Sequence, residues 1–255
     1  PVQLAVCLAS LAASMSRFDD FEVIVVDDGS PVAITIDPVL LGRLNCRLIR
    51  QPNAGPGAAR NTGVAAATGR LLVFTDDDCT LDAGCLAAFA AAHRAAPSCG
   101  FGGQTLNRLA DNPWSTASQL LNDFIQERFT DPAGSAGFFA TNNLAVPAAI
   151  FRSIGGFDPG YPLPAGEDRD FCAHWREAGH DLRLLPTALI WHAHPLNLRR
   201  FWRQQRNYGR GSYRFRERAA GRNGAPVKLE PIGFYIALCS YPLRRLPLLR
   251  ALPLV

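Results

Sequence analysis

The chain has 255 residues, of which 48% are hydrophobic and 19% are charged, with a formal net charge of +4. This composition can bury a large core and excludes an intrinsically disordered chain. The seven cysteines include no Cys-x-x-Cys pair, which argues against a zinc ribbon or a redox motif and favours a reducing compartment over a disulfide framework.

Helices and strands alternate in the first part of the chain. Apolar side chains recur at helical spacing over residues 2–15, and the β-branched run Glu22–Asp27 is typical of a buried strand. Five further elements are predicted here: a strand over Cys46–Arg50, a helix over Gly55–Ala67, a strand over Arg70–Thr75, a helix over Leu81–Arg94 and a strand over Cys99–Thr105. This alternation predicts an α/β fold with a mostly parallel central sheet and helices on both faces.

The second part continues the pattern and then becomes basic. The predicted elements are a helix over Pro113–Phe129, a strand over Phe138–Val146, a helix over Glu167–Ala178, short strands over Leu182–Leu185 and Ala188–His192, a long helix over Leu196–Ala219 and a linker over residues 221–231. The stretch from Phe234 to Val255 is apolar but interrupted by proline and arginine, so no run reaches the roughly 20 apolar residues of a spanning helix. It is expected to be an interfacial segment or the start of a longer membrane region.

Charge divides the chain in two. Residues 1–193 carry seven more acidic than basic side chains, whereas residues 194–255 carry eleven more basic than acidic ones. We therefore expect a metal or substrate site within residues 1–195, and an anionic surface such as lipid headgroups as the partner of a basic and apolar extension formed by residues 196–255. No usual nucleic-acid reader motif is present, so we expect no nucleic-acid partner.

Acidic side chains follow two of the predicted strands. Asp27 and Asp28 end the first strand, and Asp76, Asp77 and Asp78 follow the strand over Arg70–Thr75. Ligands of open α/β sheets bind beyond the carboxyl ends of the strands. Clustered carboxylates repel one another, and a magnesium or manganese ion relieves that repulsion. The alternatives are a solvated acidic turn at Asp76–Asp78 and a plain turn at Asp28-Gly29-Ser30.

Three more motifs contain polar side chains suited to catalysis or ligand binding. The glycine-rich run Gln51–Gly63 enters a helix whose first amides could meet a phosphate, with Arg60 one turn further in. The run Gly166–Phe171 opens a helix with acids that either act as a general base or only favour the helix dipole. His192 and His194 could join a metal already held by aspartates, although each could equally be an ordinary core or surface residue.

Taken in order, these motifs resemble family 2 glycosyltransferases of the GT-A fold. The resemblance is carried by EVIVVDDGS, QPNAGPGAARNTG, GRLLVFTDDDC, GGFDPGYPLPAGEDRDF and IWHAHP, and it covers residues 3–215. It implies an inverting transfer from a nucleoside-diphosphate sugar (UDP-, GDP- or dTDP-sugar) with a divalent cation, magnesium or manganese. The family's apolar first strand has no counterpart here, so we expect the chain to be a fragment of a longer reading frame.

The resemblance also assigns roles to single residues. Asp28 resembles the acid that binds the nucleobase, Asp76 the acid that binds the ribose and Asp78 the metal-binding acid. Asp168 resembles the catalytic base. The metal-binding histidine is matched by His192, with His194 as the second choice, and Arg60 is expected to bind the donor.

The acceptor is expected to be a carbohydrate or a lipid-linked molecule. Its position is indicated by Arg203, Arg206, Tyr208-Gly209 and Arg210-Gly211, which resemble the family's region near the acceptor or membrane. The expected location is cytoplasmic, peripheral to or anchored at the inner face of the cytoplasmic membrane.

Two other classes of function stay open at this point. Gly55-x-Gly57-x-x-Arg60 is close to the dinucleotide fingerprint of a Rossmann dehydrogenase, although arginine replaces the third glycine. A catalytically inactive relative that only binds sugars or lipids is the other alternative.

Overall fold

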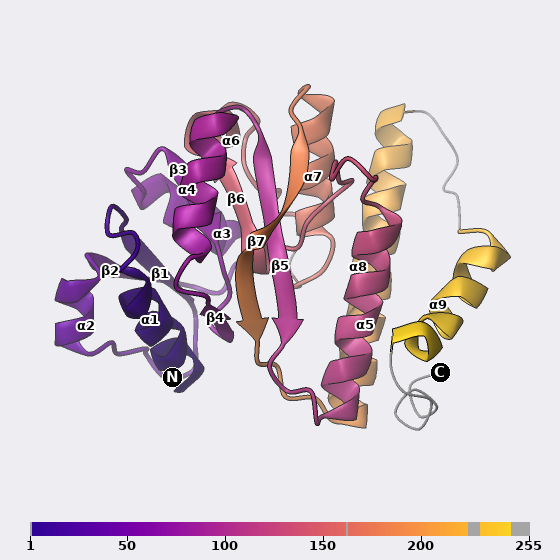
Figure 1. Ribbon diagram of the computed structural model, residues 1–255, viewed down its shortest axis with the longest axis horizontal. Coiled ribbons are helices and arrows are strands. Elements are labelled where there is room, and N and C mark those ends of the chain that lie inside the picture. The colour runs from indigo at the N-terminus through magenta and orange to yellow at the C-terminus, as the bar shows by residue number, and fades with distance from the viewer. Residues whose placement is uncertain (1, 162, 224–229, 246–255) are drawn as a thin grey trace.

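The computed structural model describes residues 2–161, 163–223 and 230–245. In this part of the chain a five-stranded sheet lies between helices (Figure 1). A two-stranded sheet with its helices lies at one end of the molecule, and three long helices lie at the other end. The predicted α/β class with flanking helices is confirmed.

The N-terminal end contains the smaller sheet. Its strands β1 (Val23–Asp28) and β2 (Cys46–Gln51) pair in parallel, with Asp28 opposite Gln51. They are accompanied by three helices, α1 (Val2–Ser14), α2 (Pro38–Arg43) and α3 (Pro56–Ala66). Leu4, Leu8 and Leu11 face the core from α1 at helical spacing. The short helix α2 was not predicted, and it begins where the side chain of Asp37 accepts from the amide of Val39.

The larger sheet has the strand order β3-β6-β5-β7-β4. The strands span Leu71–Phe74 (β3), Cys79–Leu81 (β4), Gly100–Asn107 (β5), Leu144–Pro147 (β6) and Leu182–His192 (β7). The expectation of a mostly parallel sheet is wrong. Among the described residues β1 pairs with β2 and β5 with β7 in parallel, but the pairs β3–β6, β5–β6 and β4–β7 are antiparallel. Alternating patterns do not record strand direction, and β4 follows β3 through a turn without a crossover helix.

The strand β4 replaces the start of a predicted helix. Residues Cys79–Leu81 pair antiparallel with the end of β7, with Cys79 opposite His192. Helix α4 (Cys85–Ala95) begins only after Asp82, whose carboxylate accepts from the amide of Gly84. This pairing fixes the acidic turn at the end of β3 beside the carboxyl end of β7.

A buried asparagine explains two further differences from the sequence prediction. The strand predicted over Phe138–Val146 begins only at Leu144, because a 3-10 turn over Thr141–Asn143 precedes it. The side chain of Asn143 donates to the carbonyls of Gln104 and Ala188, at 3.1 and 3.0 Å. These contacts lie at the register shift between β5 and β7, where one bulged strand replaces the two short strands predicted.

Three of the remaining helices agree with the prediction: α5 (Pro113–Arg128), α7 (Glu167–Glu177) and α8 (Leu198–Asn223). The short helix α6 (Ala148–Ser153) was not predicted, and α9 (Ile232–Arg245) covers part of the stretch that was predicted only as an apolar segment. Most of the predicted linker over residues 221–231 and the end of the apolar stretch, residues 246–255, lie outside the described residues. In the part of the chain that the structure describes, no helix is long and apolar enough to cross a membrane.

The core lies on the two faces of the larger sheet. One cluster joins α1 and α4 to the sheet through Leu8, Phe89 and Ile190. The other joins β6 to α7 through Val146, Phe171 and Trp175. Both clusters consist of fully or nearly fully buried side chains, so they hold the strand ends and the start of α7 in fixed positions.

Candidate active site

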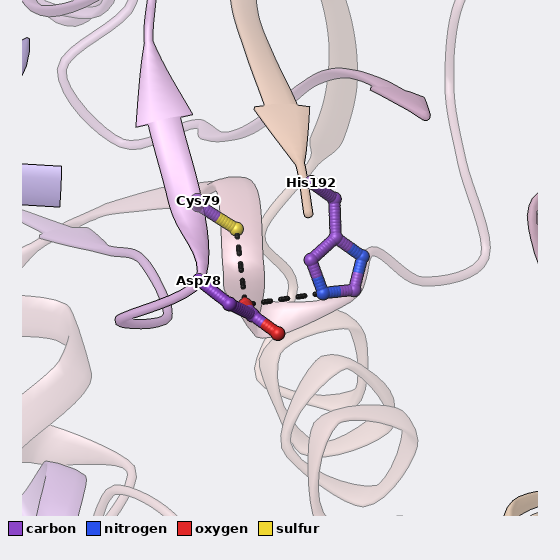
Figure 2. A group of neighbouring side chains, drawn as sticks. All are labelled: Asp78, Cys79 and His192. Carbon is purple, nitrogen blue, oxygen red and sulfur yellow. Dashed lines mark hydrogen bonds and ion pairs between the residues drawn. The ribbon is translucent and has the colours of Figure 1, made fainter. Parts of the chain in front are cut away.

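The acidic turn after β3 meets the end of β7 through Asp78 and His192. Asp78 Oδ1 lies 3.1 Å from His192 Nε2, and the thiol of Cys79 points to the same carboxylate oxygen from 3.8 Å (Figure 2). Burial alone would raise the pKa of Asp78, but the hydrogen bond and the charge of the His192 ring lower it below its ordinary value. The same bond raises the pKa of His192 against the opposing effect of burial.

This pair fits a divalent cation. The ligand atoms of Asp78, Cys79 and His192 all lie within 4.8 Å of one another. Neighbouring ligands of a six-coordinate ion at about 2.1 Å lie about 3 Å apart, close to the separation of the oxygen and nitrogen atoms here. Carboxylate oxygen suits magnesium and manganese, and imidazole nitrogen is a common ligand of first-row divalent ions.

His194 lies close to His192 but its ring is already engaged. The two ring centroids are 4.5 Å apart, and His194 Nε2 lies 2.7 Å from the side-chain amide nitrogen of Gln204. Burial and the neighbouring His192 lower the pKa of His194. The structure therefore brings His192, rather than His194, into direct contact with Asp78.

Arg60 connects the acidic turn to the start of α7. Its guanidinium donates to Glu167 Oε1 at 2.9 Å and to Asp76 Oδ1 at 3.2 Å. The arginine side chain is only 17% exposed, and that of Glu167 is 5% exposed. Asp76 and Glu167 are thus held on either side of one buried cation, which fixes the end of β3 relative to α7.

Asp168 lies half-buried in the first turn of α7. Its Oδ1 accepts from the backbone amide of Arg169 at 2.8 Å. Burial, together with the neighbouring carboxylate of Glu167, raises the pKa of Asp168 to about 6. A carboxylate with this pKa is ionised at neutral pH and accepts a proton more readily than an ordinary aspartate.

Asp28 is tied to the loop that enters α3. Its carboxylate accepts from the amides of Ala54 and Gly55, each at 2.9 Å, and from the side chain of Gln51 at 2.7 Å. The two amides at the entrance of α3 therefore already have an acceptor within the protein. These two amides precede Pro56, the first residue of α3, so they are not the helical amides for which the sequence suggested a phosphate.

Two features of the site were missed by sequence reasoning. The sequence left open whether the acids of this turn act as a base or only favour the helix, and it did not predict the ion pair of Glu167 with Arg60, which lies 107 residues earlier in the chain. Tyr208 approaches the site from α8, where its hydroxyl accepts from the side chain of Gln204, the residue that contacts His194. The tyrosine-glycine pair in the basic helix was noted, but periodicity alone could not place it near α7.

Close packing brings α8 against the loop before α7. A Cβ atom on Gly211 would lie 2.3 Å from the carbonyl oxygen of Ala165. Gly166, the residue before α7, has a φ of +94° and would also clash with Gly211 if it carried a side chain. These two glycines allow the helix and the loop to approach, so α8 covers one side of the site.

Comparison with known sequences identifies the family. The model of "Glycosyl transferase family 2" matches residues 2–153. The pre-mycofactocin glycosyltransferase of Mycobacterium tuberculosis is 31% identical over 193 residues, which cover 73% of this chain and 40% of that protein. The validoxylamine A glucosyltransferase of Streptomyces hygroscopicus subsp. jinggangensis is 30% identical over 194 residues, which cover 63% of this chain and 45% of that protein. The chain thus spans less than half the length of these relatives.

Solved structures identify the fold. The mannosyltransferase PcManGT of Pyrobaculum calidifontis, in complex with GDP-Man and Mn²⁺, superposes with a TM-score of 0.63 at 19% identity, over 99% of this chain and 70% of its own. Residues 1–349 of S. aureus TarS, in complex with UDP-GlcNAc, superpose with a TM-score of 0.58 at 17% identity, over 93% of this chain and 67% of that one. The chain belongs to glycosyl transferase family 2 and has the GT-A fold.

Proposed function

We propose that the protein is an inverting, metal-dependent glycosyltransferase that moves a sugar from a nucleoside-diphosphate sugar to an acceptor hydroxyl. The observation that carries this proposal is the contact between Asp78 and His192 at the edge of the sheet. At the same edge, Arg60 connects Asp76 to Glu167 at the start of α7. A site for a cation and a carboxylate with a raised pKa then lie on neighbouring elements. The family membership gives no support to the nicotinamide dehydrogenase alternative.

The donor is a UDP-, GDP- or dTDP-sugar. Support comes from the relatives, whose names describe glycosyl transfer, and from the structural neighbours with UDP-GlcNAc or GDP-Man. Asp28 is proposed to bind the nucleobase and Asp76 the ribose. We revise the role of Arg60, because its guanidinium is engaged with carboxylates and acts on the donor by holding Asp76 in position.

The cation is magnesium or manganese, held by Asp78 and His192. Mn²⁺ is present in two neighbouring structures, one of GalNAc-T7 and one of PcManGT. When bound, such an ion neutralises charge on a diphosphate leaving group. His194 supports this site by packing against His192 and is the second choice of ligand.

Asp168 is proposed to be the general base. Its carboxylate takes the proton of the acceptor hydroxyl while that oxygen attacks the anomeric carbon. The bond from the anomeric carbon to the diphosphate oxygen breaks in the same step, and the configuration of the sugar inverts. The pKa of about 6 keeps most of the Asp168 carboxylate ionised at neutral pH.

Residues 196–255 are proposed to meet the acceptor and an anionic membrane surface at the cytoplasmic face. Helix α9 is apolar on two faces. Phe234 and Tyr241 pack against Phe124 of α5, with ring centroids 5.2 and 5.5 Å apart. The other face exposes large apolar side chains at helical spacing: Ile232, Tyr235, Ile236 and Leu243. An exposed apolar face beside an arginine-rich helix is typical of interfacial membrane binding.

A nucleotide-release assay tests the proposed function. The purified protein is incubated with a panel of nucleoside-diphosphate sugars, with Mn²⁺ or Mg²⁺ and after removal of metal. We expect release of nucleoside diphosphate from one or a few donors, and loss of that release without metal. A protein that binds a donor but never releases nucleotide would be the inactive relative. Turnover that is independent of metal would remove Asp78 and His192 from the mechanism.

A further inference from the structure

A cavity lies between the loop before α7 and the first turns of α8. Its volume is about 370 Å³, within the range of small-molecule sites. The lining combines two arginines, two amides and a phenol with two apolar side chains: Arg200, Arg203, Gln204, Asn207, Tyr208, Pro164 and Leu196. The cavity is thus polar on the side formed by α8.

The positive charge of this cavity is not neutralised by the part of the protein that the structure describes. None of its described lining residues is acidic, and neither Arg200 nor Arg203 forms an ion pair with a described carboxylate. Arginines further along the same helix differ, because Arg216 pairs with Glu230 and Arg218 pairs with Asp158. Two exposed guanidiniums that share one cavity favour an anionic ligand.

The cavity adjoins the candidate active site through two of its lining residues. Gln204 contacts the ring of His194 at 2.7 Å and donates to the hydroxyl of Tyr208 at 3.1 Å. Pro164, which also lines the cavity, lies two residues before Gly166, the residue at the start of α7 that precedes Glu167 and Asp168. The cavity therefore borders both Gln204, the partner of His194, and the loop that leads to the proposed base.

We propose that this cavity binds a phosphate group through Arg200 and Arg203, and that the phosphate belongs to the acceptor. Guanidinium groups match phosphate oxygens with paired hydrogen bonds, and Asn207 and Tyr208 offer further donors. Only the assignment of the phosphate to the acceptor rests on the proposed function. The diphosphate of the donor is the other possible source of a phosphate group in this cavity. We favour the acceptor because His194 and Gln204 lie between the cavity and the pair formed by Asp78 and His192.

The test begins with phosphate itself, without metal or nucleotide. Inorganic phosphate and pyrophosphate are titrated into the metal-free protein by calorimetry. The test variant combines Arg200→Met and Arg203→Met, which keep most of the side-chain length and remove the charge. The control combines Arg199→Met and Arg214→Met, two exposed positions of the same helix that do not line the cavity. We expect at least tenfold weaker phosphate binding in the test variant and less than a threefold change in the control.

A second titration distinguishes the two sources of the phosphate. UDP and GDP are titrated in the presence of Mn²⁺ into wild type and both variants. Unchanged nucleotide affinity in the test variant assigns the phosphate to the acceptor. A loss equal to that of inorganic phosphate would assign it to the donor and overturn the acceptor assignment.

Two other results would contradict the proposal that this cavity binds phosphate. One is a lack of phosphate binding by the wild-type protein at millimolar concentration. The other is an equal loss of phosphate binding in the test and control variants, which would indicate that the positive electrostatic potential of the whole helix attracts phosphate. A protein that binds phosphate but does not bind nucleotide would contradict the proposed function without contradicting the phosphate site.

Discussion

Replacement of Asp168 by asparagine is expected to stabilise the protein while removing its activity. Burial and Glu167 raise the pKa of this carboxyl to about 6, against an ordinary value near 3.9. The ionised form is therefore disfavoured in the folded protein by about two pKa units, or at most about 3 kcal/mol. Because the side chain is half-buried and partly solvated, we expect about 1–2 kcal/mol. Asparagine keeps an oxygen that can accept from the amide of Arg169 but carries no charge.

The sign of the effect follows from linkage. The folded state binds the Asp168 proton more tightly than the unfolded state, so this group contributes stability below about pH 4. That contribution is lost as the pH rises through about 6. The asparagine variant lacks this titration. Its gain in the free energy of unfolding over wild type should be absent near pH 4, grow between pH 4 and 6, and stay constant above.

Activity should change in the opposite direction. Proton transfer by a positioned base contributes about 10²–10⁴-fold, so kcat should fall by that factor while the affinity for the donor and the cation stays near wild type. If Asp168 only favours the dipole of α7, its loss should instead destabilise the protein by about 0.3–1 kcal/mol and leave turnover intact. The two explanations thus differ in the sign of the stability change as well as in rate.

Urea unfolding at pH 4.5 and 7.5 measures the stability change, and nucleotide release measures turnover. Asp181→Asn serves as the control, because it removes one exposed carboxylate whose ion pair with Arg183 is also exposed. A folded Asp168→Asn variant with wild-type turnover would refute the reasoning. The base would then have to be sought at Glu167 or Asp170, both of which are buried in the first turn of α7.

Four other outcomes are expected. Asp78→Asn should weaken Mn²⁺ and donor binding together by tenfold or more, measured by electron paramagnetic resonance and calorimetry. Arg60→Met should destabilise the protein by about 3 kcal/mol in urea unfolding, because it leaves Glu167 buried without its cation; a loss below about 1 kcal/mol would contradict this role. The value of kcat/KM should decrease as the pH falls below about 6, and a flat profile between pH 5 and 7 would exclude Asp168 as the group responsible. Binding to anionic vesicles should weaken with salt and with Ile236→Glu, whereas salt-independent binding would remove the membrane proposal.

Much of the site could be predicted from sequence because its residues follow strands. Asp28 ends β1, Asp76 and Asp78 follow β3 and His192 ends β7, and the carboxyl ends of such strands carry the ligands of α/β sheets. The predicted helix that contains Asp168 was likewise confirmed as α7. Local hydrophobic patterns were sufficient for these elements, since each of them buries apolar side chains at regular spacing.

Strand direction and long-range pairing could not be predicted in the same way. Residues Cys79–Leu81 are too few for a periodic signal, yet their pairing with β7 brings Asp78 and His192 together. The contact of Arg60 with Glu167 depends on how α3 and α7 pack, and no local pattern records that.

The partners of each carboxylate separate the proposed base from the other acids of the site. Asp28 accepts three hydrogen bonds, from Gln51 and from the loop before α3, Asp78 is bonded to His192, and Glu167 is paired with Arg60. The contact with His192 also lowers the pKa of Asp78 below its ordinary value. The described hydrogen bond of Asp168 comes only from the amide of the next residue, while burial and Glu167 favour its neutral form. Unlike these three acids, Asp168 is thus left able to accept a proton from a substrate hydroxyl.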